Sequence, residues 1–81
     1  MTVLAVFRSR AQALDFLNSV KKAGVPAQAV STPKEAGVGC GISVKMDACF
    51  LLRAKNVLSG RSYSAFAGWM KQVGSGFSYT Q

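Results

Sequence analysis

Near the start of the chain lies an almost wholly apolar run, Thr2–Phe7 (TVLAVF), rich in β-branched and aromatic residues. It is far shorter than the roughly 20 residues that a membrane-spanning helix needs. Such a run predicts a buried β-strand. A chain of 81 residues buries only about 60% of the surface that its unfolded form exposes, so we expect one small core and one domain.

A helix is predicted directly after this strand, from about Arg10 to Ala23. Ser9 and Gln12 have the spacing of a capping box, in which each side chain bonds the backbone near the other. Gly24 suits the left-handed position after a helix. Apolar residues recur at helical spacing through this segment: Ala13, Leu14, Phe16, Leu17 and Val20.

Two strands, separated by a glycine-rich loop, and a second helix are expected next. Pro26 precedes an extended run, Ala27–Ser31, and Ile42–Met46 alternates apolar and polar residues as a strand with one buried face does. Between them lies Lys34–Gly41 (KEAGVGCG), which predicts a loop or turn. Asp47 is a suitable N-cap for a helix. The apolar stripe of that helix consists of Phe50, Leu51, Ala54, Val57 and Leu58.

The last segments are harder to interpret. The aromatic residues of Tyr63–Lys71 recur every three residues, which permits a helix, but Gly68 and the need to complete a sheet favour a strand. Residues 74–81 form a polar tail that we expect to be mobile or to dock elsewhere, which leaves residues 1–73 as the domain.

This β-α-β-β-α-β order predicts a ferredoxin-like α+β sandwich, an antiparallel sheet with both helices on one face. Fold alone does not disclose function. Six residues are expected to pack against the sheet: Leu14, Leu17, Val20, Leu51, Ala54 and Leu58.

The chain is strongly basic, with ten Lys and Arg against three Asp and Glu and a formal charge of +7. Such a charge suggests an acidic partner: nucleic acid, an acidic protein face or a small anion. No run of basic residues exceeds two, so their clustering depends on the fold.

The residue inventory excludes several kinds of chemistry. The chain has no histidine, and its three carboxylates, Asp15, Glu35 and Asp47, lie far apart in sequence. A Ser–His–Asp or Cys–His site is therefore impossible within it, and a metal site is improbable. Thiol chemistry, binding or a structural role remain.

Cys40 lies in the glycine-rich loop between Gly39 and Gly41, and Gly37 stands three residues before it. Glycines let the backbone N–H groups of such a loop form an anion-binding nest, and Lys34 adds a full positive charge. A thiol there would ionise more readily. The plainer alternative is a turn with a small buried cysteine.

As a whole, the chain resembles a bacterial family of small selenium/sulfur carrier-like domains, also found fused behind sulfur-carrier domains of the tRNA-thiolation type. The resemblance covers about Thr2–Lys71. Its most specific part is Ser31–Glu35 (STPKE) running into Gly39–Gly41 (GCG); the other matching parts are the strand ending at Phe7, Arg8–Leu14 and Ala23–Pro26.

The resemblance implies that Cys40 carries sulfur or selenium as a transient persulfide or selenide, an anion that Lys34 and the loop amides would stabilise. Glu35 matches an acidic position of the family, where capping a turn is favoured over proton transfer. Cys49 departs from the family pattern. It is either a resolving thiol with a pKa lowered by a helix N-terminus, or core filler beside Phe50.

We therefore expect a small cytoplasmic carrier or accessory protein rather than a stand-alone enzyme. No secretory signal, membrane segment, metal or further cofactor is expected. Its partners would be acidic donor and acceptor proteins, and assembly into a homo-oligomer stays open.

The alternative is a basic module that binds RNA or an acidic protein. Tyr63, Phe66 and Trp69 would stack on bases, helped by Arg61 and Lys71. Packing in a core or at an interface is the favoured role for these aromatic residues.

Overall fold

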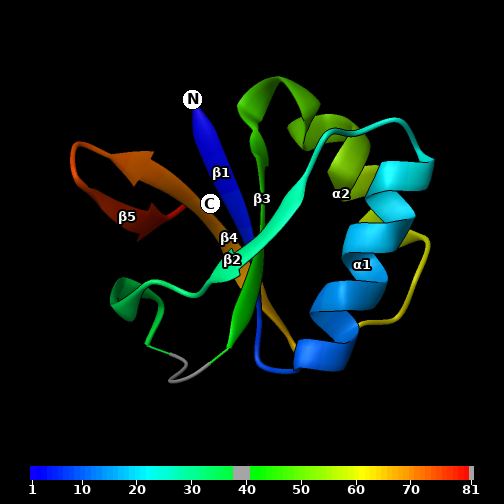
Figure 1. Cartoon of the computed structure of the whole chain (residues 1–81), viewed down its shortest axis with the longest axis horizontal. Coiled ribbons are helices and arrows are strands. Elements are labelled where there is room, and N and C mark those ends of the chain that lie inside the picture. Colours follow the sequence, from blue (N-terminus) through cyan, green and yellow to red (C-terminus); the bar gives the residue numbers. More distant parts are fainter. Residues whose placement is uncertain (38–40, 81) are drawn as a thin grey trace.

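A computed structural model describes residues 1–37 and 41–80 of the chain (Figure 1). The described part folds into five strands, two α-helices and two short 3₁₀ turns. In chain order these are β1 (Thr2–Phe7), α1 (Arg10–Lys22), β2 (Gln28–Ser31), η1 (Lys34–Ala36), β3 (Ile42–Asp47), η2 (Ala48–Phe50), α2 (Leu51–Ser59), β4 (Phe66–Val73) and β5 (Gly76–Tyr79).

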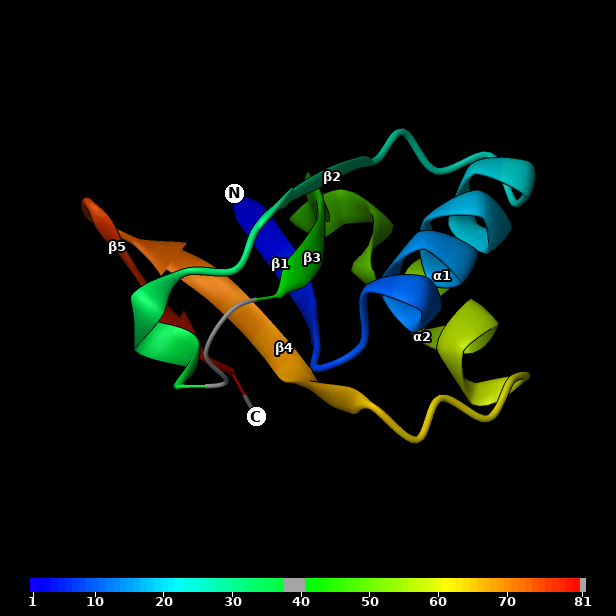
Figure 2. The same ribbon diagram turned by 60° about the horizontal axis from the view of Figure 1, so that its bottom comes forward.

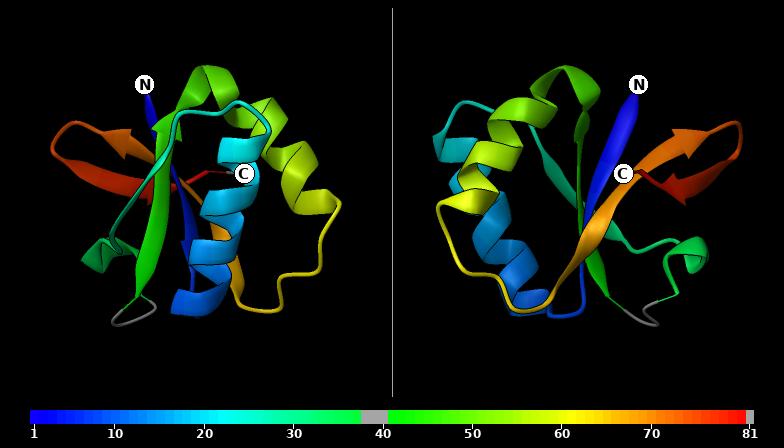
Figure 3. Two further views of the ribbon diagram at one scale, coloured as in Figure 1. Left: turned by 45° about the vertical axis from the view of Figure 1, so that its right-hand side comes forward. Right: turned by 180° about the vertical axis from the view of Figure 1, so that it is seen from behind.

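The strands form one antiparallel sheet in the order β2-β3-β1-β4-β5. β1 lies in the middle and pairs with β3 on one side and β4 on the other. Both helices cover the same face (Figure 3). The predicted α+β class, antiparallel sheet and pair of helices are confirmed. The prediction of four strands is wrong, because the sheet has a fifth.

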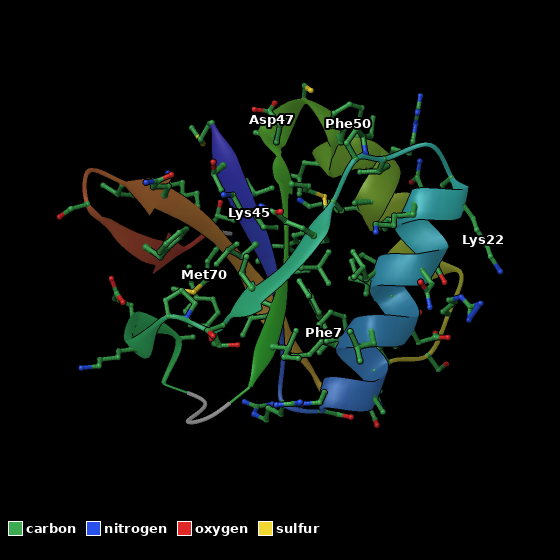
Figure 4. All side chains as sticks on the ribbon, in the orientation of Figure 1. Phe7, Lys22, Lys45, Asp47, Phe50 and Met70 are labelled. Atoms are coloured by element: carbon green, nitrogen blue, oxygen red, sulfur yellow. The ribbon has the colours of Figure 1, made fainter. Side chains whose placement is uncertain are left out.

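The helix-covered face holds the larger core cluster. Alternate residues of β1, Val3, Ala5 and Phe7, meet Phe16 of α1 and Trp69 of β4 there. Figure 4 shows Phe7 between the sheet and α1. The expected apolar stripes pack against this cluster with one exception: Leu14 is 41% exposed and lies outside it. Burial of Ala13, Phe16 and Val20 sets the face that α1 turns to the sheet, and this face leaves Leu14 at its margin.

The opposite face holds a smaller cluster of Leu4, Val6, Ala36 and Met70, with Phe77 packed against it. No helix covers it. Instead the sheet rolls until η1, which follows the β2 edge, meets β5 at the other edge (Figure 2). The buried run predicted at Thr2–Phe7 is confirmed, and this roll is why the strand is buried on both faces.

The predicted capping box at the start of α1 is half formed. The Ser9 Oγ atom accepts a hydrogen bond from the Gln12 backbone N–H at 3.3 Å. The Gln12 side chain turns away and bonds residues that lead into β4: it accepts from the Ala65 N–H and donates to the Ser64 hydroxyl. Gln12 therefore joins α1 to the segment between α2 and β4.

The segment after α2 confirms the strand interpretation of its aromatic run over Phe66–Lys71. β4 continues to Val73, and the register shifts beside Val6 and Phe7 of β1, where Gly68 has a φ of 142°. Gly74, with a φ of 58°, then turns the chain into β5. Half of the expected polar tail, Gly76–Tyr79, is thus an edge strand.

Candidate functional site

The segment that connects β2 to β3 contains most of the predicted site residues. The structure describes it up to Gly37 and again from Gly41. The predictions made for Gly39 and Cys40 therefore lie outside the described residues. The residues on either side define the frame of the site.

On the β2 side, Pro33 breaks the strand and η1 makes a single tight turn. The N–H of Ala36 donates to the Pro33 carbonyl at 3.1 Å, and the N–H of Gly37 donates to the Lys34 carbonyl at the same distance. Gly37 has a φ of 69°, a left-handed conformation that favours glycine. Lys34 is exposed beside it, so its ammonium is free to face an anion in solvent.

Glu35 is bound on the other side of this turn. Its Oε2 atom accepts a hydrogen bond from the N–H of Phe77 in β5 at 3.1 Å. Bonds from its own backbone N–H and from that of Phe77 lower the pKa of the Glu35 carboxyl, and Lys34 adds to the effect. The ionised Glu35 side chain therefore links η1 to β5 through a hydrogen bond.

A second bond holds the same turn to β5. The hydroxyl of Tyr79 donates to the carbonyl of Ala36 at 2.7 Å, and Ala36 itself is buried in the smaller cluster. The C-terminal strand thus fixes η1 from both its side chains and its backbone. Sequence reasoning did not find this support, because nothing local in a polar, glycine-containing tail shows which turn it will meet.

On the β3 side, Gly41 lies against the end of β1. A Cβ on Gly41 would stand 3.1 Å from the carbonyl oxygen of Phe7, a tight contact that glycine avoids. The carbonyl of Gly41 accepts a bond from the Thr32 N–H at 3.2 Å, which closes the base of the connection.

The next residue after Phe7 is Arg8, which is exposed at this end of the sheet. Arg8 therefore adds a second cation at the end of β1, next to Gly41. The sequence placed it only near the start of a helix. Its position beside Gly41 follows from the pairing of Val6 with Ser43, a long-range contact that the sequence does not reveal.

Cys49 lies in η2, beyond the far end of β3 (Figure 1). The strand from Gly41 to Asp47 spans about 20 Å at about 3.3 Å per residue. Cys49 is a free, exposed thiol, so the expectation that it fills the core beside Phe50 is wrong. η2 follows β3 directly, and Cys49 lies on its solvent-exposed side.

The environment of Cys49 also reverses the expected direction of its pKa. A hydrogen bond to the Asp47 carboxylate raises the pKa of the Cys49 thiol, and partial desolvation and the negative charge of Asp47 act in the same direction. The predicted capping by Asp47 is present, because its Oδ2 atom accepts from the Cys49 N–H at 2.9 Å. The same carboxylate therefore caps η2 and disfavours the Cys49 thiolate.

The aromatic residues considered for RNA binding belong to the helix-side core. Trp69 is 8% exposed and meets Phe16 edge-on at a centroid distance of 6.2 Å. The rings of Tyr63 and Phe66 also pack against the ring of Phe7, with centroid distances of 5.5 Å and 5.4 Å respectively. The favoured role of these residues in packing is confirmed.

The three carboxylates are well separated in the fold, and each is bonded. Asp15 accepts from Tyr63 at 2.6 Å and from Arg61 at 3.2 Å, which holds the segment after α2 against α1. Glu35 and Asp47 bond β5 and η2 as described. Within residues 1–37 and 41–80, no three His, Cys, Asp or Glu side chains gather as a metal site would require.

The described helices are too short and too polar to span a membrane.

Comparison with protein families places most of the chain in a known family. Residues 2–65 match the family described as "Putative Se/S carrier protein-like". The match runs from β1 through α2 and includes the whole connection between β2 and β3, and it ends one residue before β4. Searches of curated proteins and of solved structures found no match. Because the match covers most of the chain, the chain belongs to the Se/S carrier-like family.

Proposed function

We propose that this chain is a small cytoplasmic carrier of sulfur or selenium, with Cys40 as the residue that bears the atom. The match to the Se/S carrier-like family over residues 2–65 carries this proposal. It includes Cys40 and both sides of the connection that contains it. An accessory or carrier role suits a chain that has no histidine and whose three carboxylates each hold structural hydrogen bonds.

Sulfur loading is a thiolate exchange. The Cys40 thiolate attacks the terminal sulfur of a donor persulfide and forms a new S–S bond. The S–S bond of the donor breaks, and its electron pair leaves on the donor as a thiolate. No net oxidation occurs, so the step needs no further redox partner. Transfer to an acceptor thiolate is the same exchange in reverse.

The frame around Cys40 favours the anionic forms in this exchange. Lys34 is exposed within the connection, Arg8 is exposed at the end of β1, and the acid of the connection, Glu35, is bound to the Phe77 amide. The N–H of Gly37 bonds the Lys34 carbonyl, so we infer that the backbone N–H groups near Gly39 and Gly41 are the ones that add to this positive field. Together these groups would lower the pKa of Cys40 and stabilise a bound persulfide or selenide.

Cys49 has no step in this proposal. It follows the far end of β3, and the raised pKa of its thiol makes it a poor nucleophile at neutral pH. It serves instead as a matched internal control for Cys40.

We further propose that β1–β4 and the two helices correspond to a ferredoxin-like βαββαβ unit, to which β5 adds a strand beside β4. The order β2-β3-β1-β4 and the crossing of each helix between two strands support this.

The test is loading with glutathione persulfide, followed by intact-protein and peptide mass spectrometry. We expect the native chain and Cys49→Ser to gain one sulfur atom on Cys40, and Cys40→Ser to gain none. Lys34→Gln should slow the loading, because the new anion loses a nearby cation. Equal loading on Cys40 and Cys49, or loading that survives Cys40→Ser, would contradict the proposal.

A further inference from the structure

The end of the molecule that carries η2 and the start of α2 exposes large apolar side chains. Leu52 is 74% exposed and Met1 is 70% exposed. The Met1 carbonyl accepts a bond from the Ala48 N–H at 2.7 Å, which holds Met1 next to η2. Large exposed apolar side chains at one end of a small protein indicate an interaction site.

A shallow hollow lies in the same place. It has a volume of about 360 Å³ and is lined by Cys49, Phe50, Leu52, Arg53 and Asn56. We refer to these five residues as the α2 hollow. Its lining combines an aromatic ring, a leucine and a guanidinium, and Figure 4 shows Phe50 at this end of the molecule.

Positive charge lies where the start of α2 meets the end of α1. The Nη1 atom of Arg53 lies 3.5 Å from the position that a Cβ on Gly24 would take, so the start of α2 lies against the end of α1. The last turn of α1 carries Lys21 and Lys22, both exposed. The nearest acid, Asp47, is bound by the Met1 ammonium at 3.2 Å and by the Cys49 N–H.

These features select one kind of occupant. A second copy of this chain would bring another charge of +7 and would be repelled. A concave surface lined by both apolar and polar side chains suits a projecting protein side chain better than it suits a flat lipid bilayer. We propose that the α2 hollow docks an acidic protein segment, which inserts one apolar side chain beside Phe50 and Leu52 and pairs its carboxylates with Arg53, Lys21 and Lys22.

This docking site lies at the opposite end of β3 from Gly41 (Figure 1). A partner held there would leave the connection between β2 and β3 uncovered. The inference goes beyond the carrier function and does not depend on it, since no residue of the α2 hollow takes part in the proposed transfer.

The test uses a fluorescently labelled amphipathic peptide with glutamates along one side and a Leu–Phe pair on the other, titrated against the full chain by anisotropy. A peptide of the same composition without an apolar side is the control. Leu52→Ser and Arg53→Glu should each weaken binding of the amphipathic peptide about tenfold. Two matched variants, Leu14→Ser and Arg10→Glu, change an exposed leucine and a cation elsewhere and should leave binding unchanged.

The competing occupants are further arms of the same experiment. Vesicles of phosphatidylglycerol and a single-stranded RNA should bind with no difference between the native chain and Leu52→Ser. The proposal would be overturned by equal affinity for the two peptides, by an equal loss in all four variants, or by vesicle binding that depends on Leu52 while peptide binding does not. Peptide binding in Cys40→Ser should match the native chain, so failure of sulfur loading and failure of docking are separate results.

Discussion

Asp47 bonds three different groups at the junction of β3 and η2. Its carboxylate accepts from the Cys49 backbone N–H, from the Cys49 thiol and from the Met1 ammonium. These bonds, led by the backbone N–H, lower the pKa of Asp47 to about 2 from an ordinary value of 3.8. The sequence predicted the cap, since Asp before a helix is a common N-cap. It did not predict the thiol bond, which depends on how η2 turns.

Because the pKa of Asp47 is lowered, the stability of the protein should depend on pH in the acid range. A carboxyl with a lower pKa in the folded state contributes stability above its unfolded pKa and loses it as the pH falls through the folded value. Asp47→Asn removes the charge but keeps an acceptor for the Cys49 N–H. We expect its melting temperature to lie below that of the native chain at pH 7 and to converge with it as the pH falls from about 4 to about 2.

Thermal melts by circular dichroism at several pH values would measure this convergence. Glu35→Gln is the control, because the pKa of Glu35 is also lowered but the residue lies on η1, away from Asp47. A difference between native and Asp47→Asn proteins that stays constant down to pH 2 would show that the Asp47 charge does not stabilise the fold.

At the scale of elements, β5 and η1 hold the two edges of the sheet together. Gly68 of β4 makes this contact possible. Its φ of 142° lies in a region that other residues rarely adopt, and the Tyr79 ring lies over it. A Cβ at this position would stand 3.1 Å and 3.2 Å from two carbons of that ring. The hydroxyl of the same ring bonds Ala36, so the glycine, the ring and the turn are coupled.

Gly68→Ala should therefore cost about 1–3 kcal/mol of unfolding free energy, from backbone strain and displacement of the Tyr79 ring. Gly60→Ala is a matched control. Gly60 has a φ of −80° at the end of α2, and a Cβ there would meet only ordinary contacts at 3.7 Å. It should change stability by no more than about 0.5–1 kcal/mol, and in the stabilising direction. Urea denaturation measures both, and equal losses in the two variants would refute the role of Gly68.

Elements with strong local signals were predicted well from the sequence. The apolar run at Thr2–Phe7, the Ser9 cap and the stripes of the two helices all depend on neighbouring residues, and the structure agrees with them apart from Leu14. β5 was missed, because Gly76–Tyr79 is short and half exposed and is a strand only through its pairing with β4. Its contacts with η1 join residues about 40 positions apart, which no local pattern encodes.

The candidate site shows the same division. The exposed Lys34 and the glycine turn at Gly37 follow from the local sequence, and the structure places them together. The position of Arg8 depends on strand pairing, and the hydrogen bond of Glu35 to β5 depends on the roll of the sheet. Cys49 was misjudged because its exposure depends on η2, an irregular turn where a regular helix start was expected.

At the scale of the whole molecule, the sheet has one fully enclosed strand and two open edges. β1 is paired on both sides and buried on both faces, while β2 and β5 are each paired on one side only. Opening β1 requires breaking both core clusters, whereas an edge strand can separate locally. One amide of the β5 edge is an exception to this local opening. The roll of the sheet brings Glu35 to the Phe77 N–H, which donates a hydrogen bond to it.

Amide hydrogen exchange should therefore resolve three levels of protection. Amides of β1 should exchange only through global unfolding, with a free energy equal to that from urea denaturation. Most amides of β2 and β5 should exchange faster, through local opening. The Phe77 amide should exchange more slowly than the Tyr79 amide two residues later, because the Phe77 N–H is bonded to Glu35. Glu35→Ala should remove the extra protection at Phe77 and leave the ranking of β1 above the edges unchanged. If Glu35→Ala instead accelerated exchange across β1 and Phe77 alike, the contact between η1 and β5 would be part of the global fold, and the two edges would not open independently of the centre.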